Sequence, residues 1–500
     1  MSDSAPLRDC VNDAVLGSTL ALRVSALPHG WRDASWFTSL TVTPETNECA
    51  GGKRAPPICT ARVHAGWLHL PRFRGMKLLG GCAPPDDRRS MGIPMNESRR
   101  RFEGVLREDP PQIEATRAVV SSLETLGGAM LVLPCGFGKT VCALWVVRKM
   151  ARRTLVLVHT GALADQWAHR IATFLPDVVV GRIQRDVVNV EGCDVVVGMI
   201  QSLVRREYER DLLSTFGMVV VDEAHHIAAP WFGRALGKLS ARYIVGLSAT
   251  PDRKDGCGCI LPWLLGDLAF RAHRETSASD AVVRIVEYVD ASAQIELLDW
   301  RGKPAVSKML TRLATDATRT AYVVSLIMQY VVAKEKEGCR RRHMIVLSQR
   351  RDQLVEIQRL LEQEDGCVCV TTKKKKRARS EETVEEEAAV MPRFTVGCVM
   401  GGTPPALRDA GFGATVLLST YSYAAEGIDI PRLDTLVMAS PGINIEQTVG
   451  RILRPHPQKQ TPLIVDVRDV FSLFIGMGWK RYNFYASQNY TVRTEKHEVL

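Results

Sequence analysis

Residues 133–140 read LPCGFGKT, and this stretch decides how the chain around it must fold. The apolar run from Leu131 to Leu133 predicts a strand, and Val141 to Met150 predicts a buried helix. Gly136 and Gly138 indicate a tight turn between them, because glycine adopts backbone conformations that other residues avoid. A strand, a glycine turn and a helix in this order are typical of an α/β unit with a parallel sheet.

The same stretch has the composition of a phosphate-binding loop. Backbone N–H groups at the start of the helix and the Lys139 ammonium can converge on anionic oxygens, and the Thr140 hydroxyl can bind a magnesium ion. Leu133 replaces the first glycine of the full pattern, which leaves the shorter GxGKT form. A glycine turn before an ordinary core helix is the alternative. The predicted nucleotide-binding residues are Pro134, Cys135, Gly136, Phe137, Gly138, Lys139 and Thr140.

Residues 222–225 read DEAH and follow a second strand-like run, Met218 to Val221. Asp222 therefore stands where a strand ends and is a candidate ligand of the metal ion, directly or through water. Glu223 is suited to orient and deprotonate the attacking water. An acidic pair at a solvated strand end is the alternative. Both segments in this order predict hydrolysis of ATP with Mg²⁺ as the metal ion.

Composition limits the class of protein. The chain has 500 residues, 46% of them hydrophobic, which exceeds what one core usually supports, so two α/β units with accessory regions are expected. The formal charge of +10 suits a polyanionic partner, although other basic proteins look the same. No apolar stretch reaches transmembrane length and the N-terminus lacks a signal pattern, so we expect a soluble intracellular protein without a membrane partner.

Thirteen cysteines raise the question of metal sites and disulfides. No CxxC pair occurs, and this favours reduced thiols that behave as small apolar residues. A loose group near the N-terminus is the alternative, as a zinc site. Its members are Cys49, Cys59, His64, His69 and Cys82.

Strand-like runs alternate with helical patterns in two blocks, and this predicts two parallel sheets with ligands at the carboxyl ends of their strands. Short apolar runs between Gly and Pro clusters predict a small β-rich domain before the first block. The predicted boundaries are 1–100 for this accessory domain and its linker, 101–275 for the ATP-binding α/β domain, 276–315 for an inter-domain linker, 316–470 for the second α/β domain and 471–500 for a C-terminal tail.

Residues 371–392 interrupt the second block with a basic run followed by an acidic run. Neither half can bury enough apolar surface to order itself, so a flexible surface loop is expected. Lys373 to Arg379 also has the composition of a nuclear import signal or of a nucleic-acid-binding finger. A nuclear location is therefore one alternative for this chain.

Further motifs follow in order along the chain. Ser248-Ala249-Thr250 comes directly after a predicted strand, AAEGIDIP spans Ala424 to Pro431, and QTVGRILR spans Gln447 to Arg454. With the two phosphate-site segments, this order resembles that of the superfamily-2 helicases over about residues 106 to 470. The resemblance implies two RecA-like domains in tandem.

Within that superfamily, three stretches are similar to the branch that contains XPB, the phage UvsW helicase and helicases of large DNA viruses. They are LVLVHTGALADQW (residues 155–167), LSATPDRKDG (residues 247–256) and LHLPRFRG (residues 68–75). The resemblance implies translocation on DNA in the 3′ to 5′ direction. It also adds a viral factory to the expected locations.

The resemblance implies that residues of both halves act on ATP. Phosphoryl transfer spreads negative charge over the equatorial oxygens, and a guanidinium from the second domain stabilises this charge. Arg454 is implied to be that arginine finger, with Arg451 contacting the γ-phosphate and Gln447 helping to orient it. A surface basic helix is the alternative for these residues.

Other residues are implied to surround the nucleotide. Gly427 and Asp429 are implied to approach its sugar. Gln112 resembles the glutamine that reads adenine, although Pro111 stands where an aromatic residue usually precedes it. Ser248 and Thr250 resemble the motif that couples the state of ATP to strand separation.

Polar residues at strand ends are implied to contact nucleic acid. Hydroxyls, amides and loop N–H groups suit phosphate and sugar contacts, which position a strand without reading its sequence. Each residue alone is equally typical of an ordinary loop or a helix cap. The candidates are Thr160, Gly161, Gln201, Ser202, Gln349, Arg350 and Thr420.

Together these features predict an ATP-dependent helicase or translocase that acts on nucleic acid, with DNA favoured over RNA. Residues 1–100 are left open to protein partners. An RNA-directed helicase or transcript-release factor is one alternative, because the DEAH spelling does not distinguish the two polymers. A degenerate motor that only docks other proteins is another, although intact Lys139, Asp222 and Glu223 argue against it.

Overall fold

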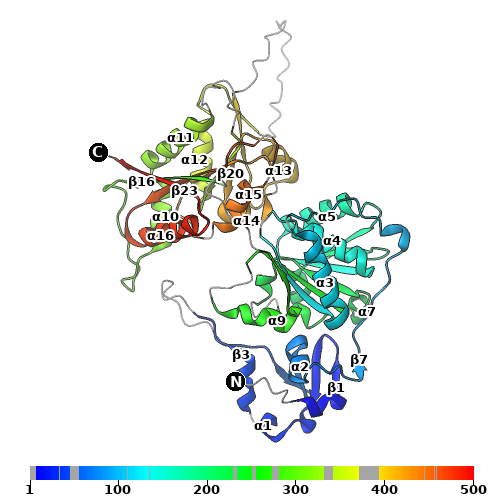
Figure 1. The fold of residues 1–500 in the computed structure, drawn as a ribbon. Coiled ribbons are helices and arrows are strands. Elements are labelled where there is room, and N and C mark those ends of the chain that lie inside the picture. The colour runs from blue at the N-terminus through cyan, green and yellow to red at the C-terminus, as the bar shows by residue number, and fades with distance from the viewer. Residues whose placement is uncertain are drawn as a thin grey trace. The chain divides into compact units, whose positions relative to one another are not determined.

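The computed structural model divides the chain into two compact units, Met1–Arg274 and Glu275–Leu500 (Figure 1). Cys135, Asp429 and the expected loop 371–392 lie outside the residues that the structure describes. Among the described residues, no helix is long and apolar enough to cross a membrane. The described residues are 7–32, 34–45, 56–109, 111–134, 136–228, 233–250, 255–272, 281–331, 342–370, 393–428, 430–443, 445–454, 456–457 and 459–499.

An eight-stranded sheet forms the centre of the first unit. Neighbouring strands pair in parallel except at the edge strand β11, which is antiparallel to β10. The inner strands are rich in Val, Ile and Leu, as expected where both faces of a parallel sheet are covered. The strand order is β11 (Val187–Asn189), β10 (Val180–Gln184), β12 (Val195–Met199), β9 (Thr154–Val158), β13 (Met218–Val221), β14 (Tyr243–Ser248), β8 (Gly128–Val132) and β15 (Leu268–Arg271).

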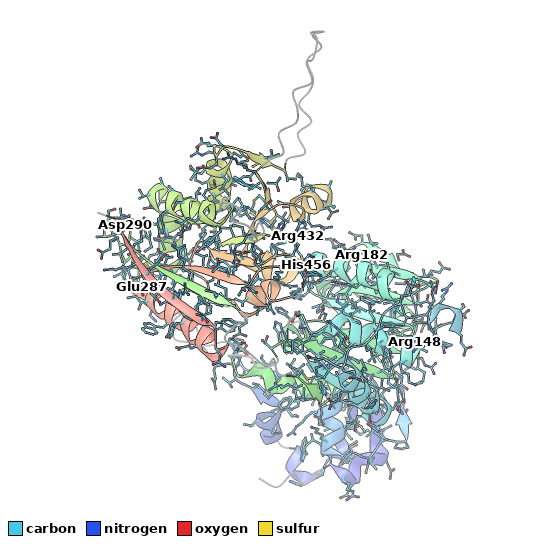
Figure 2. All side chains as sticks on the ribbon, turned by 45° about the horizontal axis from the view of Figure 1, so that its top comes forward. Arg148, Arg182, Glu287, Asp290, Arg432 and His456 are labelled. Carbon is cyan, nitrogen blue, oxygen red and sulfur yellow. The ribbon has the colours of Figure 1, made fainter. Side chains whose placement is uncertain are left out.

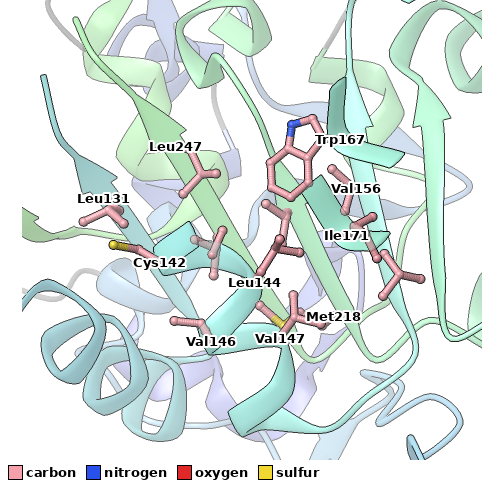
Figure 3. Packing of buried hydrophobic residues seen from close by; sticks show 14 of the residues in the cluster. Leu131, Cys142, Leu144, Val146, Val147, Val156, Trp167, Ile171, Met218 and Leu247 are labelled. Atoms are coloured by element: carbon pink, nitrogen blue, oxygen red, sulfur yellow. The ribbon is translucent and has the colours of Figure 1, made fainter. Parts of the chain in front are cut away.

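Helices cover both faces of this sheet, because successive side chains of a strand point to opposite sides. Val156 of β9 joins the core under one set of helices, and its neighbour Leu157 joins the core on the other face. Figure 3 shows Leu144 and Val147 packed in the first of these cores, with the Trp167 indole beside them. The first set is α3 (Gln112–Leu126), α4 (Lys139–Met150) and α5 (Gly161–Phe174), and the second includes α6 (Ile200–Arg205), α8 (Gly233–Leu236) and α9 (Ile260–Leu265).

The N-terminal region is β-rich, as predicted, and it belongs to the same compact unit. Helix α2 (Arg72–Leu78) attaches it to the α/β domain with the eight-stranded sheet. The buried Arg72 guanidinium donates hydrogen bonds to the Ala241 and Leu239 carbonyl oxygens, at 2.7 and 3.3 Å. Lys77 pairs with Asp267 nearby. The five-stranded sheet has the order β5 (Arg62–His64), β6 (Trp67–Pro71), β2 (Thr19–Arg23), β1 (Ala14–Leu16) and β7 (Asp86–Asp87).

The basic stretch from Arg88 to Arg101, at the end of the predicted accessory domain, is packed along the first unit. The Ser90 N–H donates to the Ser240 carbonyl oxygen at 2.7 Å, and the Met95 N–H donates to Ala151 at 2.9 Å. The Met95 side chain is buried in the core of the first sheet. Hydrogen bonds and a buried side chain therefore hold this stretch against the α/β domain, between the accessory sheet and the eight-stranded sheet.

A second eight-stranded sheet, with all neighbouring strands parallel, forms the second unit. Two of its strands lie where no strand was expected, β16 within the predicted linker 276–315 and β23 within the predicted tail 471–500. The two sheets confirm the predicted α/β class. The order is β18 (Cys367–Cys369), β19 (Phe394–Cys398), β20 (Val416–Thr420), β17 (Met344–Ser348), β21 (Thr435–Met438), β22 (Leu463–Asp469), β16 (Val282–Val289) and β23 (Thr491–Glu498).

Buried ion pairs hold the helices of this unit to its sheet. Arg319 donates to both carboxylate oxygens of Asp469 at 2.8 Å, and Arg481 pairs with Asp466 at 2.9 Å. Helices α11 (Ala317–Val331) and α12 (Arg351–Leu361) cover one face, α14 (Tyr421–Gly427), α15 (Glu446–Ile452) and α16 (Ser472–Ser487) cover the other, α10 (Val306–Thr315) packs on α11 and α12, and α13 (Pro405–Phe412) packs on β19.

Candidate functional site

Five neighbouring strands of the first sheet bring the predicted motifs to one edge. The strands β12, β9, β13, β14 and β8 are adjacent and parallel, so their carboxyl ends lie side by side. One predicted residue follows directly or closely after each end: Gln201, Thr160, Asp222, Thr250 and Lys139. Segments that are far apart in the sequence are thereby assembled at the position where parallel α/β sheets bind ligands.

The phosphate loop has the backbone that its glycines predicted. Gly136 and Gly138 have φ values of +88° and +85°, in the left-handed region that favours glycine. A Cβ atom on Gly138 would lie 2.5 Å from the Gln112 side-chain nitrogen, so a larger residue does not fit there. Helix α4 begins at Lys139, whose ammonium donates to the Leu133 carbonyl oxygen at 3.2 Å. The helix N-terminus and the ammonium therefore adjoin the same short loop.

Gln112 holds this loop in place. Its side-chain Nε2 donates to the Phe137 carbonyl oxygen at 2.9 Å, and its Oε1 accepts from the Arg107 N–H at 3.1 Å. Gln112 is only 2% exposed. Both ends of the amide bind backbone groups, so Gln112 positions the loop. The adenine contact implied by resemblance stays a prediction.

Asp222 is buried at the end of β13 and is held from two sides. The Trp167 indole N–H donates to Oδ2 at 2.8 Å, and the Glu223 N–H donates to Oδ1 at 2.9 Å. Burial raises the pKa of Asp222, and the Glu223 carboxylate raises it further, whereas the Trp167 hydrogen bond and Lys139 lower it. Within the described residues, no Arg or Lys forms an ion pair with Asp222. The carboxylate is thus fixed and oriented by hydrogen bonds without an ion pair.

Glu223 sits in an unusual backbone conformation. Its φ of +46° lies in the left-handed region, which costs energy for a residue with a side chain and is common at functional sites. Its carboxylate lies 3.5 Å from His225 Nδ1. The His226 ring stands between those of His159 and His225, with centroid distances of 4.0 and 4.3 Å. The strand end after β13 is therefore packed against the end of β9.

The Ser248 segment is bonded directly to the start of the phosphate loop. The Leu133 N–H donates to the Ser248 carbonyl oxygen at 3.1 Å, and the Ser248 hydroxyl accepts from the Thr250 N–H at 3.2 Å. Ser248 is fully buried. Displacement of this segment would be transmitted to the phosphate loop through that backbone hydrogen bond.

The predicted nucleic-acid residues of the first unit shape the ends of β9 and β12. The Thr160 hydroxyl caps α5 by accepting from the Leu163 N–H at 3.3 Å, and Gly161 is the first residue of that helix. Gln201 Nε2 donates to the His159 carbonyl oxygen at 2.7 Å. The Ser202 hydroxyl accepts from a backbone N–H and is largely buried, so it supports the loop more than it offers a contact.

The corresponding residues of the second unit lie at the carboxyl edge of its sheet. Gln349 and Arg350 follow β17, Thr420 ends β20, and Gly427 ends α14. The Gln349 N–H donates to the Ser440 hydroxyl at 2.8 Å. These parallel strands are neighbours, so the residues share one edge.

Helix α15 carries the two predicted ATP-contacting residues Gln447 and Arg451 one turn apart, on the same face of the helix. Arg451 is 9% exposed, so the alternative of an exposed basic helix does not hold for it. The helix ends at Ile452, and Arg454 therefore belongs to the segment that follows. The Lys459 ammonium donates to the Arg454 carbonyl oxygen at 2.8 Å.

The sequence prediction assigned no role to Trp167, although its indole contacts the most important carboxylate of the site. No local pattern reveals this contact, because it joins α5 to β13 across 55 positions of the chain. The zinc alternative gains no support: within the described part of the chain, no three His, Cys, Asp or Glu residues form a group that could hold a metal ion. Cys49 lies outside that part.

Comparisons with known proteins agree with this geometry. Residues 106–253 match the family model "Type III restriction enzyme, res subunit". The chain is 27% identical to "Putative ATP-dependent RNA helicase L396" of Acanthamoeba polyphaga mimivirus, over 86% of this chain and 76% of that protein. It is 28% identical to "Putative ATP-dependent RNA helicase QP509L" of African swine fever virus (isolate Pig/Kenya/KEN-50/1950), over 74% and 70%.

A solved structure supports the fold. S. cerevisiae Dbp5 bound to RNA and ADP BeF3 superimposes with a TM-score of 0.50 at 13% identity, covering 76% of this chain and 89% of that one. The two sheets thus have the fold of tandem RecA-like domains. The chain is thus similar to ATP-dependent helicases of large DNA viruses, and this similarity supports hydrolysis of ATP as its activity.

Proposed function

We propose that this helicase hydrolyses ATP in order to move along one strand of DNA, in the 3′ to 5′ direction, and thereby opens or remodels duplexes. The observation that carries the proposal is the shared carboxyl edge of the first sheet, where the phosphate loop, the buried Asp222 and the predicted strand contacts follow five neighbouring strands. The proposed direction of movement and the proposed preference for DNA are based on the resemblance of residues 155–167 and 247–256 to the XPB and UvsW branch.

The residues of the first unit fit ATP with a magnesium ion. The loop N–H groups and Lys139 suit the phosphates, and the Thr140 hydroxyl and the Asp222 carboxylate are the oxygen ligands that Mg²⁺ prefers. Positive charge brought to Asp222 would offset the burial that raises the pKa of this carboxyl. The bound ion would neutralise charge on the phosphates. Glu223 is placed one residue further to accept the proton of the attacking water.

We assign the second unit the task of completing the reaction. Arg451 and Arg454 stabilise the charge of the transferred phosphoryl group, and Gln447 helps to orient it. Gly427 and Asp429 approach the sugar. The one-turn spacing of Gln447 and Arg451 supports a common task for these two side chains.

The strand contacts are assigned to residues that carry hydroxyl, amide or guanidinium groups at strand ends. Such groups hold phosphates and sugars and give little base specificity. The net charge of +10 favours a polyanion. In the first unit the contacts are Thr160, Gly161, Gln201 and Ser202, with Ser248 and Thr250 coupling them to ATP, and in the second they are Gln349, Arg350 and Thr420.

Phosphate release measured with and without single-stranded polynucleotide tests the proposal. Hydrolysis should rise several-fold with single-stranded DNA, and forked duplexes with a 3′ single-stranded arm should be opened faster than those with a 5′ arm. Equal hydrolysis with and without every polynucleotide would contradict a nucleic-acid motor. It would favour a degenerate motor that docks other proteins.

RNA is the second candidate substrate, because the viral relatives are named RNA helicases. Competition distinguishes the two polymers. Unlabelled RNA and DNA of one sequence should be titrated against a labelled DNA strand at the same salt concentration, since phosphate contacts make affinity salt-dependent. If the inhibition constant is lower for RNA than for DNA, RNA becomes the proposed substrate. The proposal that the protein moves along nucleic acid by hydrolysing ATP is then unchanged.

A further inference from the structure

An exposed tryptophan stands on a rigid turn in the second unit. Trp300 is 85% exposed, although the tryptophan ring is among the largest apolar groups of a protein. The turn around it is closed by Asp299, whose carboxylate accepts from the Arg301 and Lys303 N–H groups at 2.8 and 3.0 Å. The Asp299 N–H also donates to the Lys303 carbonyl oxygen at 2.7 Å. The ring is therefore presented to solvent by a well-bonded turn.

A guanidinium covers this ring, and a second cation follows in the same turn. The Arg301 guanidinium lies over the Trp300 ring at 4.3 Å from its centroid, and Lys303 is exposed beside it. The one carboxylate of the turn, Asp299, is occupied by backbone N–H groups, and these hydrogen bonds lower its pKa. A flat ring next to cations is the arrangement with which proteins bind unpaired bases and their phosphates.

Helix α10 continues the surface directly after the turn. Its buried side is apolar, with Met309 and Leu313 in a small core with Phe474 of α16. Its exposed side carries the cations Lys308 and Arg312. Hydroxyl groups fill the same side, and these residues are Ser307, Thr311 and Thr315.

Arg350 connects this helix to the predicted strand contacts. Its Nη2 donates to the Ser307 hydroxyl and carbonyl oxygens at 2.8 Å, and its Nε donates to the Thr311 hydroxyl at 3.1 Å. Arg350 follows the end of β17, and the Trp300 turn follows the end of β16, where Figure 2 labels Asp290 just beyond the strand. Both strands belong to one parallel sheet, so α10 and the turn lie at its carboxyl edge.

We propose that the turn at residues 298–304 and the exposed side of α10 bind single-stranded nucleic acid, with Trp300 stacking on a base and Lys308 and Arg312 holding phosphates. This inference rests on the proposed function and adds a binding surface that its motifs do not include. Residues 299–312 contain four Lys or Arg and one Asp, a balance that suits a polyanion.

A protein partner is the competing occupant, because Leu298 is also about half exposed. The charge balance argues against it, since the cores of protein interfaces are depleted in charged residues, especially lysine. Arg350, a predicted contact of the strand backbone, shares its hydrogen bonds with α10. A strand on Gln349 and Arg350 would therefore meet the exposed side of this helix next.

Binding of labelled single strands, measured by fluorescence anisotropy, tests the proposal in the full-length protein. Trp300→Ala should weaken binding about 5- to 150-fold, the range for loss of one stacked base. An abasic strand should bind both proteins equally, and Trp300→Phe should restore most of the affinity for normal strands. Lys308→Ala should weaken binding to both strands and lower the slope of log affinity against log salt by about one.

Two matched controls come from the same unit. Trp479 is 58% exposed on α16, and Lys480 follows it, so Trp479→Ala and Lys480→Ala remove the same groups elsewhere and should bind as the wild type. If the wild type binds single strands and its hydrolysis is stimulated by them, but Trp300→Ala binds with the same affinity, this inference is wrong and the proposed function is unaffected. Failure of the wild type to bind any strand would overturn the proposed function with it.

Discussion

Three buried carboxylates, Asp222 of the first unit and Asp466 and Asp469 of the second, have different partners. In the second unit, Asp469 and Asp466 are fully buried and each is paired with an arginine, Arg319 and Arg481. In the first unit, Asp222 is equally enclosed but is held by an indole N–H and a backbone N–H. Two of these three carboxylates thus have an arginine partner, and Asp222 has hydrogen bonds without an ion pair.

This difference indicates where chemistry takes place. A buried ion pair satisfies itself, and removal of one partner leaves an uncompensated charge. A buried carboxylate with hydrogen bonds but no cation is oriented and still attracts positive charge. The edge that carries Asp222 is therefore suited to receive a cationic ligand, whereas Asp466 and Asp469 of the second unit are already neutralised. Four predictions can break or sharpen this contrast.

The largest effect is expected from the charged groups of the first unit. Lys139→Ala and Glu223→Gln should lower kcat for ATP by at least about 100-fold, because they remove the proposed phosphate-binding cation and the proposed general base. Thermal unfolding should stay close to that of the wild type, since both side chains are partly exposed. Phosphate release and circular dichroism measure the two quantities. A large loss of stability would show that these groups are structural.

The second unit should respond in the reverse way. Arg319→Ala removes the partner of Asp469 and should lower the free energy of unfolding of this unit by about 3–5 kcal/mol. Denaturant unfolding measures this value. The matched control is Arg359→Ala, which breaks an exposed pair with Glu356 and should leave stability nearly unchanged. Equal effects of the two variants would remove the contrast between the sheets.

A smaller effect is expected for the indole that orients Asp222. Trp167→Phe keeps an aromatic ring, although a smaller one, and removes a hydrogen bond to a charged group, which is worth about 1.5–3 kcal/mol. We expect kcat to fall about 10-fold or more and the Mg²⁺ concentration for half-maximal hydrolysis to rise. Trp145→Phe, on the neighbouring α4, is the control. An unchanged magnesium requirement would limit Trp167 to packing.

The smallest effect separates two roles for Gln112. Because its amide binds two backbone groups of the loop region, Gln112→Ala should weaken all nucleoside triphosphates alike, by about 2- to 10-fold for a loss of roughly 0.5–1.5 kcal/mol. Competition of ATP with GTP measures the selectivity. A selective loss for ATP would instead support the adenine contact that the sequence implied.

Local patterns were sufficient to predict the glycine turn before α4 and the strands that precede the motifs. The spacing of Gly136, Gly138 and Lys139 determines that loop, because φ values and a helix start depend on neighbouring residues. The strand before it was placed at Leu131 to Leu133, whereas β8 extends from Gly128 to Val132. A Cβ on Gly128 would lie 2.2 Å from the Phe73 ring, so the residue type at this position is limited by a segment that is distant in the sequence.

The remaining misses have the same cause. Strands β16 and β23 pair with each other across about 200 residues, and a strand with half-polar composition such as β23 is recognised only by its partner. Met95 is buried although its flanks are basic. Likewise, the donor to Asp222 comes from a helix whose own pattern indicates only amphipathic packing. Pairing and burial between distant segments are not encoded in local periodicity.

Helix α5 has one further consequence. It begins at Gly161, next to the Thr160 cap, and two turns later it carries the indole that grips Asp222. If Thr160 contacts the nucleic acid, as proposed, one helix connects that contact directly to the carboxylate of Asp222. Strain on the bound strand would then change the orientation of the Asp222 carboxylate, and with it the rate of ATP hydrolysis.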